Sequence, residues 1–323
     1  MWDALAGVDP RAGFMQASFW ADFKRAEGYT VRRYGWWEGE ALSGGATVYE
    51  FASASGQPGI AVCPEGPVLD WDDAAGSRAR LRSLIEAVRA DFPRALSFRI
   101  EPHLSPTPPS ILRNFQRAPF DLTPVHTLVL DLTESEDALF ASMRPKGRYN
   151  CRVAERHDVR VASSASLADM AVFYRLFSAT ARRQQFFAEP YRFFLNLGAA
   201  LFPGRHAEVF LAEWQRTVLA AALVVFHGHR ATFLYGGSSH ENRHVMPAYA
   251  LHREIMNYAR RRGCTEYDLY GFDPFGNPEH EYAGFSRFKR QLGGTVRSTL
   301  GARDLLWYDR IAEQLLPQLR ATV

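Results

Sequence analysis

The spacing of hydrophobic residues in the first third of the chain alternates between helical and strand-like periods. Phe14, Phe19, Trp20 and Phe23 recur at helical spacing, and Gly28 follows where a helix would end. The pattern then predicts a hairpin of 30–37 and 41–51, an amphipathic helix over 78–92, a strand over 96–100 and a proline-rich loop over 103–109. This part of the chain is therefore expected to be mixed α/β.

A second series of elements begins near Ser135. The predicted ranges are helices from 135 and over 148–156, 167–183, 191–201 and 247–262, strands over 207–214, 218–227, 230–235 and 265–270, and a closing helix over 305–319. Gly263 is placed as a C-cap. Each half thus has the order helix, hairpin, helix, strand, which predicts two α/β units with a boundary near residue 134. No heptad hairpin occurs, so no coiled-coil arm is expected.

Composition agrees with a two-domain globular chain. With 323 residues, of which 47% are hydrophobic, the chain can bury a substantial core. Charged residues make up 23% and aromatic residues 13%, which excludes a disordered protein. The formal net charge of +3 does not suggest a protein that coats nucleic acid, although it allows a local basic groove.

The cysteines and the apolar stretches indicate the cellular compartment of the protein. Cys63, Cys151 and Cys264 are far apart, and no CxxC or Cys/His pair has zinc-ligand spacing, so we expect no metal and a reduced, cytoplasmic protein. The N-terminus carries no signal-peptide pattern, and the longest apolar stretch, 218–226, is too short to cross a bilayer. A membrane-bound substrate would be reached by peripheral contact with the inner face of the membrane.

Lysine is rare among the basic residues. It occurs only at Lys24, Lys146 and Lys289, whereas the remaining 35 of the 38 basic residues are arginine. A generic positive charge in this chain is therefore an arginine, and each lysine is a candidate for a role that a compact ammonium fills better than a guanidinium. Survival of three lysines by chance is the alternative.

Two clusters of arginines each allow a functional and a structural interpretation. Arg148, Arg152 and Arg156 would form one stripe on a helix, which either holds phosphates or is a solvated face paired with acids such as Glu155. Arg183, at the end of the helix over 167–183, either binds a carboxylate or phosphate or caps the helix.

A third cluster gathers polar and glycine residues near strand ends. It comprises Tyr235–Arg243, Asp268–Asp273 and Gly284–Lys289, which leads into the pair Gly293 and Gly294. Glycines there allow a ligand to approach the backbone, and α/β proteins build sites from residues at strand ends. Ordinary strand-to-loop turns would explain the glycines alone.

At these positions the chain resembles the Fem family of peptidyltransferases. The run Asp131-Leu-Thr, the motif Arg148-Tyr-Asn-x-Arg-x-Ala-Glu155 and the pair Thr180 and Arg183 are similar to its motifs in the same order. Tyr235–Ser239, Asp268–Gly271 and Gly284–Lys289 match its later motifs, so the likeness is good over about residues 125–305. Gln16, Trp20 and Lys24 resemble its opening helix less specifically, and the first domain otherwise matches poorly.

The resemblance implies a fold and an activity. It implies two tandem acetyltransferase-like domains of the compact, armless type, over 1–133 with 300–323 and over 134–299, the C-terminal helix returning to the first domain. Members transfer an amino acid from aminoacyl-tRNA to the side-chain amine of a peptidoglycan stem peptide, on a UDP-linked or a lipid-linked precursor. No cofactor is implied.

The resemblance also assigns roles to residues. Lys289 is the candidate for stabilising the oxyanion, and Asp268 or Asp273, or the substrates themselves, would remove the proton. Lys24 and Arg183 would anchor the phosphates or carboxylates of the precursor. The remaining candidates are Thr180, Tyr235, Gly236, Ser238, Tyr270 and Phe288 for substrate binding, and Arg148, Arg152 and Arg156 for tRNA.

Two other functions remain open at this point. An acyl-CoA-dependent N-acyltransferase has the same fold, but its R/Q-x-x-G-x-G/A pyrophosphate loop is missing: Arg262-Gly263 and Arg290 to Gly294 do not fit it. A non-catalytic protein that binds tRNA or the precursor is the other alternative, and the presence of Lys289 in its motif argues against it.

Overall fold

The computed structural model describes residues 1–51, 59–280 and 282–312, which form two compact units. The first comprises Met1–Val125 with the described residues from Thr299 onward, and the second comprises His126–Ser298. We had placed the boundary at 133/134, eight residues further on. The difference arises because β6 (His126–Asp131) pairs with β11 (Glu266–Gly271) and β12 (Thr295–Ser298), which are strands of the second unit.

The first unit is built on a six-stranded sheet with the order β1-β2-β3-β4-β13-β5. Its strands are β1 (Val31–Glu38), β2 (Ala41–Phe51), β3 (Ile60–Pro64), β4 (Ser97–Glu101), β5 (Gln116–Arg117) and β13 (Arg303–Leu306). Its helices are α1 (Trp2–Val8), η1 (Phe14–Gln16), α2 (Ser18–Ala26), α3 (Ala74–Asp91) and η2 (Ser110–Leu112). The strands β3 and β4 are parallel and α3 connects them, because only a crossover can join parallel neighbours. Apolar residues of α3 pack against the sheet to form the core of this unit.

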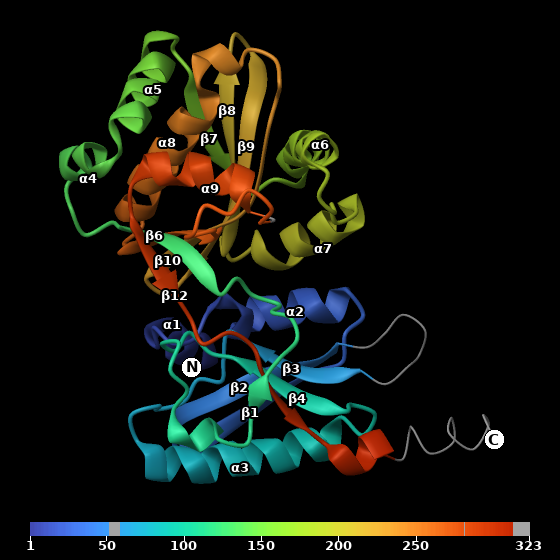
Figure 1. Ribbon diagram of the computed structural model, residues 1–323. Helices are drawn as coiled ribbons and strands as arrows, with labels where there is room; N and C mark the ends of the chain where they lie inside the picture. Colours follow the sequence, from blue (N-terminus) through green and yellow to red (C-terminus); the bar gives the residue numbers. More distant parts are fainter. Residues whose placement is uncertain (52–58, 281, 313–323) are drawn as a thin grey trace. The chain divides into compact units, whose positions relative to one another are not determined.

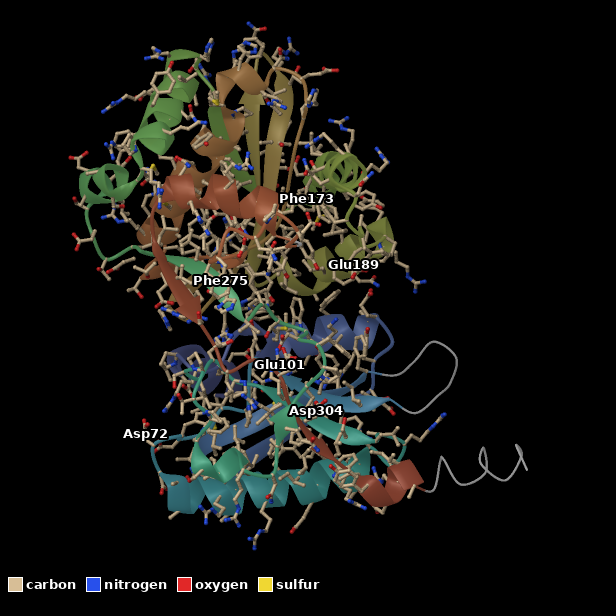
Figure 2. All side chains as sticks on the ribbon, viewed as in Figure 1. Asp72, Glu101, Phe173, Glu189, Phe275 and Asp304 are labelled. Atoms are coloured by element: carbon tan, nitrogen blue, oxygen red, sulfur yellow. The ribbon has the colours of Figure 1, made fainter. Side chains whose placement is uncertain are left out.

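The end of the chain corrects one prediction. A closing helix was expected over 305–319, but Leu305 lies in β13, which pairs with β4 and β5, and the helix begins only after Trp307. Asp304, which Figure 2 labels in this unit, fixes β13 to β4 through a buried ion pair with Arg99. Residues 313–319 of the expected helix lie outside the described residues.

The second unit has a seven-stranded sheet with the order β12-β6-β11-β10-β9-β8-β7. The remaining strands are β7 (Arg160–Ser164), β8 (Ala207–Trp214), β9 (Thr217–His227) and β10 (Arg230–Ser238). The helices are α4 (Glu136–Ser142), α5 (Pro145–Arg156), α6 (Leu167–Gln184), α7 (Tyr191–Leu201), η3 (Arg243–Val245), α8 (Pro247–Arg261), α9 (Ala283–Lys289) and η4 (Arg290–Leu292). Figure 1 shows α6 and α8 on opposite faces of β8 and β9, against which the apolar side of each helix packs.

The neighbouring strands β10 and β11 of this sheet pair over only part of their length. β10 and β11 pair in parallel only at three positions, from Arg230↔Glu266 to Thr232↔Asp268. Beyond these, β10 bulges between Phe233 and Tyr235 and continues to Ser238, while the pairing of β11 with β6 becomes irregular between Asp268 and Gly271. A bulge bends its strand away from the ladder. The two strands therefore open a gap in the middle of the sheet, and helices must close it.

Candidate functional site

A cavity of about 310 Å³ lies along β10, beyond the positions at which this strand pairs with β11. Five elements contribute its walls: β9, β10, α9, the first turns of α8, and the end of α6. The principal lining residues are Phe233, Gly236, Gly237 and Ser238 of β10, Gly284, Phe285, Phe288 and Lys289 of α9, Ala248, Leu251 and His252 of α8, and Thr180 and Arg183 of α6. The cavity thus brings together six of the residues proposed from the sequence: Thr180, Arg183, Gly236, Ser238, Phe288 and Lys289.

Lys289 is the one lysine in this cavity and is almost fully enclosed. Its side chain is 6% exposed, its Nζ donates to the carbonyl oxygen of Gly271 at 2.6 Å, and the same atom lies 5.8 Å from the ring centre of Phe233. Burial lowers the pKa of this ammonium to about 7, against the opposing effect of the Asp268 carboxylate. Near neutral pH the cavity wall therefore holds a group that exchanges between ammonium and amine.

The backbone at the end of β11 creates the acceptor for Lys289. Tyr270 has φ +60°, a left-handed conformation that is rare for an aromatic residue. Asp268 stabilises this turn by accepting the backbone N–H of Tyr270 at 2.7 Å. We infer that the turn, which interrupts the pairing of β11 with β6, presents the Gly271 carbonyl to Nζ. Tyr270 itself does not line the cavity, so its role is to shape the strand end.

The two candidate bases do not line the cavity. Asp268 and Asp273 are 5% and 1% exposed, and both are used by the backbone of their own loop. Asp273 Oδ1 accepts the N–H of Phe275 at 2.8 Å, and its backbone N–H donates to Ser286 Oγ at 2.8 Å. Among the described residues, Asp273 Oδ2 has no hydrogen-bond partner. A carboxylate that does not reach the cavity cannot accept a proton directly from a substrate bound there.

Thr180 and Arg183 connect α6 to the end of β10. Thr180 Oγ1 donates to the carbonyl oxygen of Leu176 at 2.9 Å and accepts the backbone N–H of Ser238 at 2.9 Å. Arg183 Nη2 donates to Thr180 Oγ1 at 3.2 Å and to the Ser238 carbonyl oxygen at 3.1 Å. Both acceptors are neutral, and among the described residues no carboxylate pairs with this exposed guanidinium. Its charge is therefore available to an anionic ligand.

A second, more open pocket of about 620 Å³ adjoins the cavity. The two share Arg183, Gln184, Ser238, Ala248 and Phe288. The second pocket extends over the loop before α8, where its lining adds basic side chains and the first residues of that helix: His240, Arg243, His244, Pro247 and Tyr249. A helix N-terminus and basic side chains favour negatively charged ligands. A ligand that fills both spaces would have an anionic outer part and an inner part at Lys289.

Tyr235 and Gly237 serve packing. Tyr235 was proposed to bind substrate, but its ring centre lies 5.5 Å from that of Phe177 and 5.2 Å from that of Phe194, and it does not line the cavity. At Gly237, a Cβ would lie 2.5 Å from backbone atoms of Leu176 and Phe177. Only glycine lets α6 lie this close to β10, so the glycine motif is explained at this position by helix–sheet contact.

The proposed arginine stripe is only partly available. Arg148 donates to the carbonyl oxygens of Ala141 and Met143, and thereby caps α4. Arg152 and Arg156 are exposed on α5, where their guanidinium groups lie 5.4 Å and 5.9 Å from the ring centres of Phe140 and Tyr149. The surface available to a polyanion therefore comprises Arg152 and Arg156, without Arg148.

Lys24 belongs to the first unit. It lies in α2, half-buried, with its ammonium 4.8 Å from the ring centre of Tyr29 and 5.1 Å from that of Phe23. Cation–π contacts of this kind hold an ammonium in one position. The site of Lys289 contains none of these residues, so the structure assigns the two lysines to separate units.

His252 is a cavity residue that sequence reasoning missed. It is 2% exposed and lies on α8, with its ring centre 4.8 Å from that of Phe233 and 5.3 Å from that of Phe288. Its Nδ1 is 2.8 Å from the hydroxyl of Tyr267, and burial together with the charge of Lys289 lowers the pKa of His252 to about 3. The helical pattern of 247–262 indicates a buried face but carries no sign that this face borders a cavity.

The described residues offer neither a metal site nor a membrane-spanning helix. Among the described residues, no group of three or more His, Cys, Asp or Glu side chains is arranged to hold a metal ion. No helix within the same residues has both the length and the apolar character that a membrane span requires.

Comparisons with known proteins agree on one family and one fold. The model of the FemAB family matches residues 116–217 and 207–306. The chain is 22% identical to the Lipid II:glycine glycyltransferase of Staphylococcus aureus (strain MRSA252), over 98% of this chain and 94% of that protein. It superposes on the crystal structure of FemX with a TM-score of 0.87 at 19% identity, covering 97% of both chains. A tandem GNAT protein from the clavulanic acid biosynthesis pathway gives a TM-score of 0.52 at 12% identity and covers 94% of this chain and 93% of that one. The fold is therefore a tandem pair of acetyltransferase-like units, as the element order predicted, and the described residues include no coiled-coil arm.

Proposed function

Because the chain belongs to the FemAB family and is a transferase, we propose that it transfers an amino acid from aminoacyl-tRNA to an amine of a peptidoglycan precursor. The acceptor is the side-chain amine of the stem peptide, on a lipid-linked or UDP-linked precursor. The proposal is supported by the name of the Staphylococcus aureus relative, which acts on lipid II and transfers glycine. The observation that carries it is Lys289, a buried ammonium in the wall of the cavity along β10.

The reaction is the aminolysis of an ester. It requires a group that stabilises negative charge on the carbonyl oxygen, and the cavity contains Lys289. The neutral amine attacks the carbonyl carbon, a C–N bond forms, and the carbonyl electron pair moves to oxygen. The tetrahedral intermediate then collapses, the C–O bond to the 3′-terminal ribose breaks, and the ribose oxygen leaves with a proton from the amine nitrogen. Lys289 stabilises the oxyanion by charge, which is often the largest catalytic contribution.

Proton transfer is assigned to the substrates themselves. The carboxylates of Asp268 and Asp273 do not line the cavity, whereas the amine and the departing ribose oxygen are bonded to the same carbon in the intermediate. A proton can therefore pass between them directly or through one water molecule. Asp268 instead favours the charged form of Lys289, and Phe288 and Gly236 shape the wall beside it.

The donor class separates this function from its alternatives. We would incubate the purified protein with glycyl- and alanyl-tRNA or with acetyl-CoA, each with a lipid-linked and a UDP-linked pentapeptide acceptor, and detect the product by mass spectrometry. Aminoacyl transfer from tRNA supports the proposal. Transfer from acetyl-CoA alone would establish an acyl-CoA-dependent enzyme, and binding of tRNA without product from any pair would indicate a non-catalytic protein.

Arg183 is expected to bind an acidic group of the acceptor. Its guanidinium faces both pockets without a carboxylate partner among the described residues, and a charge-assisted contact contributes about 1.5–3 kcal/mol. Arg183→Ala should therefore raise the KM of the acceptor by roughly tenfold to a hundredfold, with kcat nearly preserved. Arg182→Ala, one residue earlier and also exposed, is the matched control. If the two variants have the same KM and kcat, Arg183 only connects α6 to β10 and does not bind the acceptor.

Arg152 and Arg156 are expected to contact tRNA phosphates. Reversing both charges (Arg152→Glu with Arg156→Glu) should weaken tRNA binding and reduce the slope of log affinity against log salt by roughly 1–2, because each phosphate contact contributes about 0.7–0.9. The matched control reverses Arg78 and Arg82, which are exposed at the same spacing on α3. Filter binding across a salt series measures both slopes. An unchanged slope in the α5 variant would identify the pair as a solvated face.

A further inference from the structure

His252 presents a nitrogen atom to the cavity in which Lys289 lies. Its ring is held between Phe233 and Phe288, at centroid distances of 4.8 Å and 5.3 Å, so it has little freedom to turn. Nδ1 is committed to the Tyr267 hydroxyl at 2.8 Å. Nε2 has no hydrogen-bond partner among the described residues. It is also not among the polar atoms of these residues that are both inaccessible to solvent and without a partner. It therefore opens to the cavity that His252 lines.

The hydrogen bond to Tyr267 determines which nitrogen carries the proton. Tyr267 is fully buried, and within the described part of the chain its hydroxyl has no partner other than His252 Nδ1. If Nδ1 donated this bond, the hydroxyl hydrogen would be left without an acceptor in the core, which is energetically costly. If the hydroxyl donates, no group is left unsatisfied. Tyr267 therefore donates to Nδ1, and the proton of the neutral imidazole is on Nε2.

The surroundings also keep the ring neutral. Lys289 of α9 places a positive charge near it, Phe233 and Phe288 provide apolar contacts, and Tyr267 of β11 contributes an uncharged hydroxyl. A second positive charge on His252 would be both desolvated and repelled. The ring is thus unsuited to be a base, since Nδ1 is occupied and Nε2 already bears hydrogen. It is suited to donate one fixed hydrogen bond.

We propose that His252, held by Tyr267 as the neutral Nε2–H tautomer, donates a hydrogen bond to the carbonyl oxygen of the aminoacyl ester and to the oxyanion that forms from it. This inference rests on the proposed function, since it requires an acyl group in the cavity. The carbonyl electron pair moves to oxygen as the C–N bond forms, and it returns when the C–O bond to ribose breaks. His252 keeps its proton throughout, and Tyr267 is a positioning residue. Two donors from different helices, Lys289 of α9 and His252 of α8, thereby share one oxygen.

The tautomer can be observed without any activity. In protein labelled with ¹⁵N-histidine, the signals of His252 are identified as those missing from His252→Gln. We expect Nε2 to be protonated and Nδ1 to be a bare acceptor, unchanged between pH 5 and 9. In Tyr267→Phe the ring should lose this fixed state and populate both tautomers. A wild-type ring protonated on Nδ1, or one that becomes charged within this range, would overturn the inference while leaving the proposed function intact.

The contact is tested with a stable mimic of the donor. Adenosine bearing a glycyl group in amide linkage at its 3′ position carries the carbonyl oxygen but cannot transfer. Saturation should shift the His252 Nε2–H signal downfield in the wild type. Binding that moves other signals, such as those of the ring protons of Phe288, without moving this one would overturn the inference alone. Absence of any binding would overturn the proposed function and the inference with it.

Kinetics then measures the size of the effect. His252→Leu keeps the volume and loses the donor, and should lower kcat by about tenfold to a hundredfold with KM nearly unchanged, because the second donor at Lys289 remains. His252→Gln should restore most of the rate, since its amide N–H reaches the position of Nε2. Tyr267→Phe should lose a few-fold only. Equal kcat for the Leu and Gln variants, with both folded by circular dichroism, would mean that the ring serves packing.

Discussion

Replacing Lys289 with methionine is expected to lower kcat by about 10²–10³ with little change in the KM of either substrate. The ammonium stabilises a charge that exists only in the transition state, so its loss is felt in kcat. Methionine keeps the length and volume of the side chain in a position that is 6% exposed. Folding should be preserved or improved, because the variant no longer buries a charge.

The pH dependence of this effect tests the charge itself. The pKa of Lys289 is lowered to about 7, so the ammonium is the main form below that pH and the amine above it. An ammonium that stabilises the oxyanion loses its value as pH rises through about 7. The ratio of kcat/KM between wild type and Lys289→Met should therefore shrink above this pH, and the ionisation of the acceptor amine cancels from the ratio. A ratio that grows through pH 7 would mean that the neutral amine of Lys289 acts as a base.

Two further variants define the alternatives. Lys289→Arg should recover only part of the rate, because a planar guanidinium cannot place its charge at the position of Nζ beside the Gly271 carbonyl. A phosphate anchor would instead show a raised KM and a normal kcat in Lys289→Met. Single-turnover rates with saturating tRNA separate the two, and His252→Leu in the same background tests whether the donors act on one atom, since their effects should then not be additive.

The sequence predicted the second unit well because its hydrophobic pattern is strong. The runs over 207–214 and 218–227 are mostly apolar, and the structure places them as the neighbouring interior strands β8 and β9. The pattern failed where tertiary pairing decides the element. Leu305 and Leu306 continue an apolar helical spacing with Trp307, yet they lie in β13 because this segment completes the first unit's sheet. The predicted boundary near residue 134 differs from the observed one for the same reason, because residues 126–131 pair with strands of the second unit.

The candidate site was predictable only in part. The scarcity of lysine pointed to Lys289, and the motif pointed to Arg183, and both line the cavity. Asp268 and Asp273, proposed as bases beside the alternative of the substrates themselves, do not line the cavity. Polar residues after a strand predict a site but not the direction of each side chain, and here both carboxylates accept hydrogen bonds from backbone amides. His252 could not be found, since a histidine on an apolar helix face is normally a core residue. Its place beside a cavity depends on where β10 and β11 stop pairing, and strand pairing cannot be read from the sequence of one helix.

Removing the carboxylate of Asp304 is expected to destabilise the first unit by about 3–5 kcal/mol. Asp304 of β13 and Arg99 of β4 form two parallel hydrogen bonds, at 2.7 Å and 2.8 Å, and their side chains are only 9% and 2% exposed. Arg99 Nη1 also donates to the Phe120 carbonyl oxygen at 3.0 Å. Asp304→Ala therefore leaves a guanidinium buried in the sheet without a counter-charge, which costs more than the loss of the bonds themselves.

Tryptophan fluorescence is well suited to measure this loss. Six of the seven tryptophans lie in the first unit, namely Trp2, Trp20, Trp36, Trp37, Trp71 and Trp307, and only Trp214 lies in the second. Urea unfolding followed by fluorescence thus reports mainly on the unit that contains β13, while circular dichroism reports on both. We expect the fluorescence transition of Asp304→Ala to move to lower urea and to fall below the dichroism transition, because the substitution destabilises the first unit alone.

Two controls distinguish a buried charge from other causes. Asp309→Ala removes a carboxylate from the same segment, but its ion pair with Arg89 is exposed, so the unfolding transition should barely move. The double variant Arg99→Met with Asp304→Leu removes both charges and fills the same space, and should recover most of the stability that the single variant loses. If the double variant is no more stable than Asp304→Ala, the loss comes from the geometry of the β4–β13 pairing and not from an uncompensated guanidinium. If Asp304→Ala itself costs less than about 1 kcal/mol, water reaches Arg99 and the pair behaves as an exposed one.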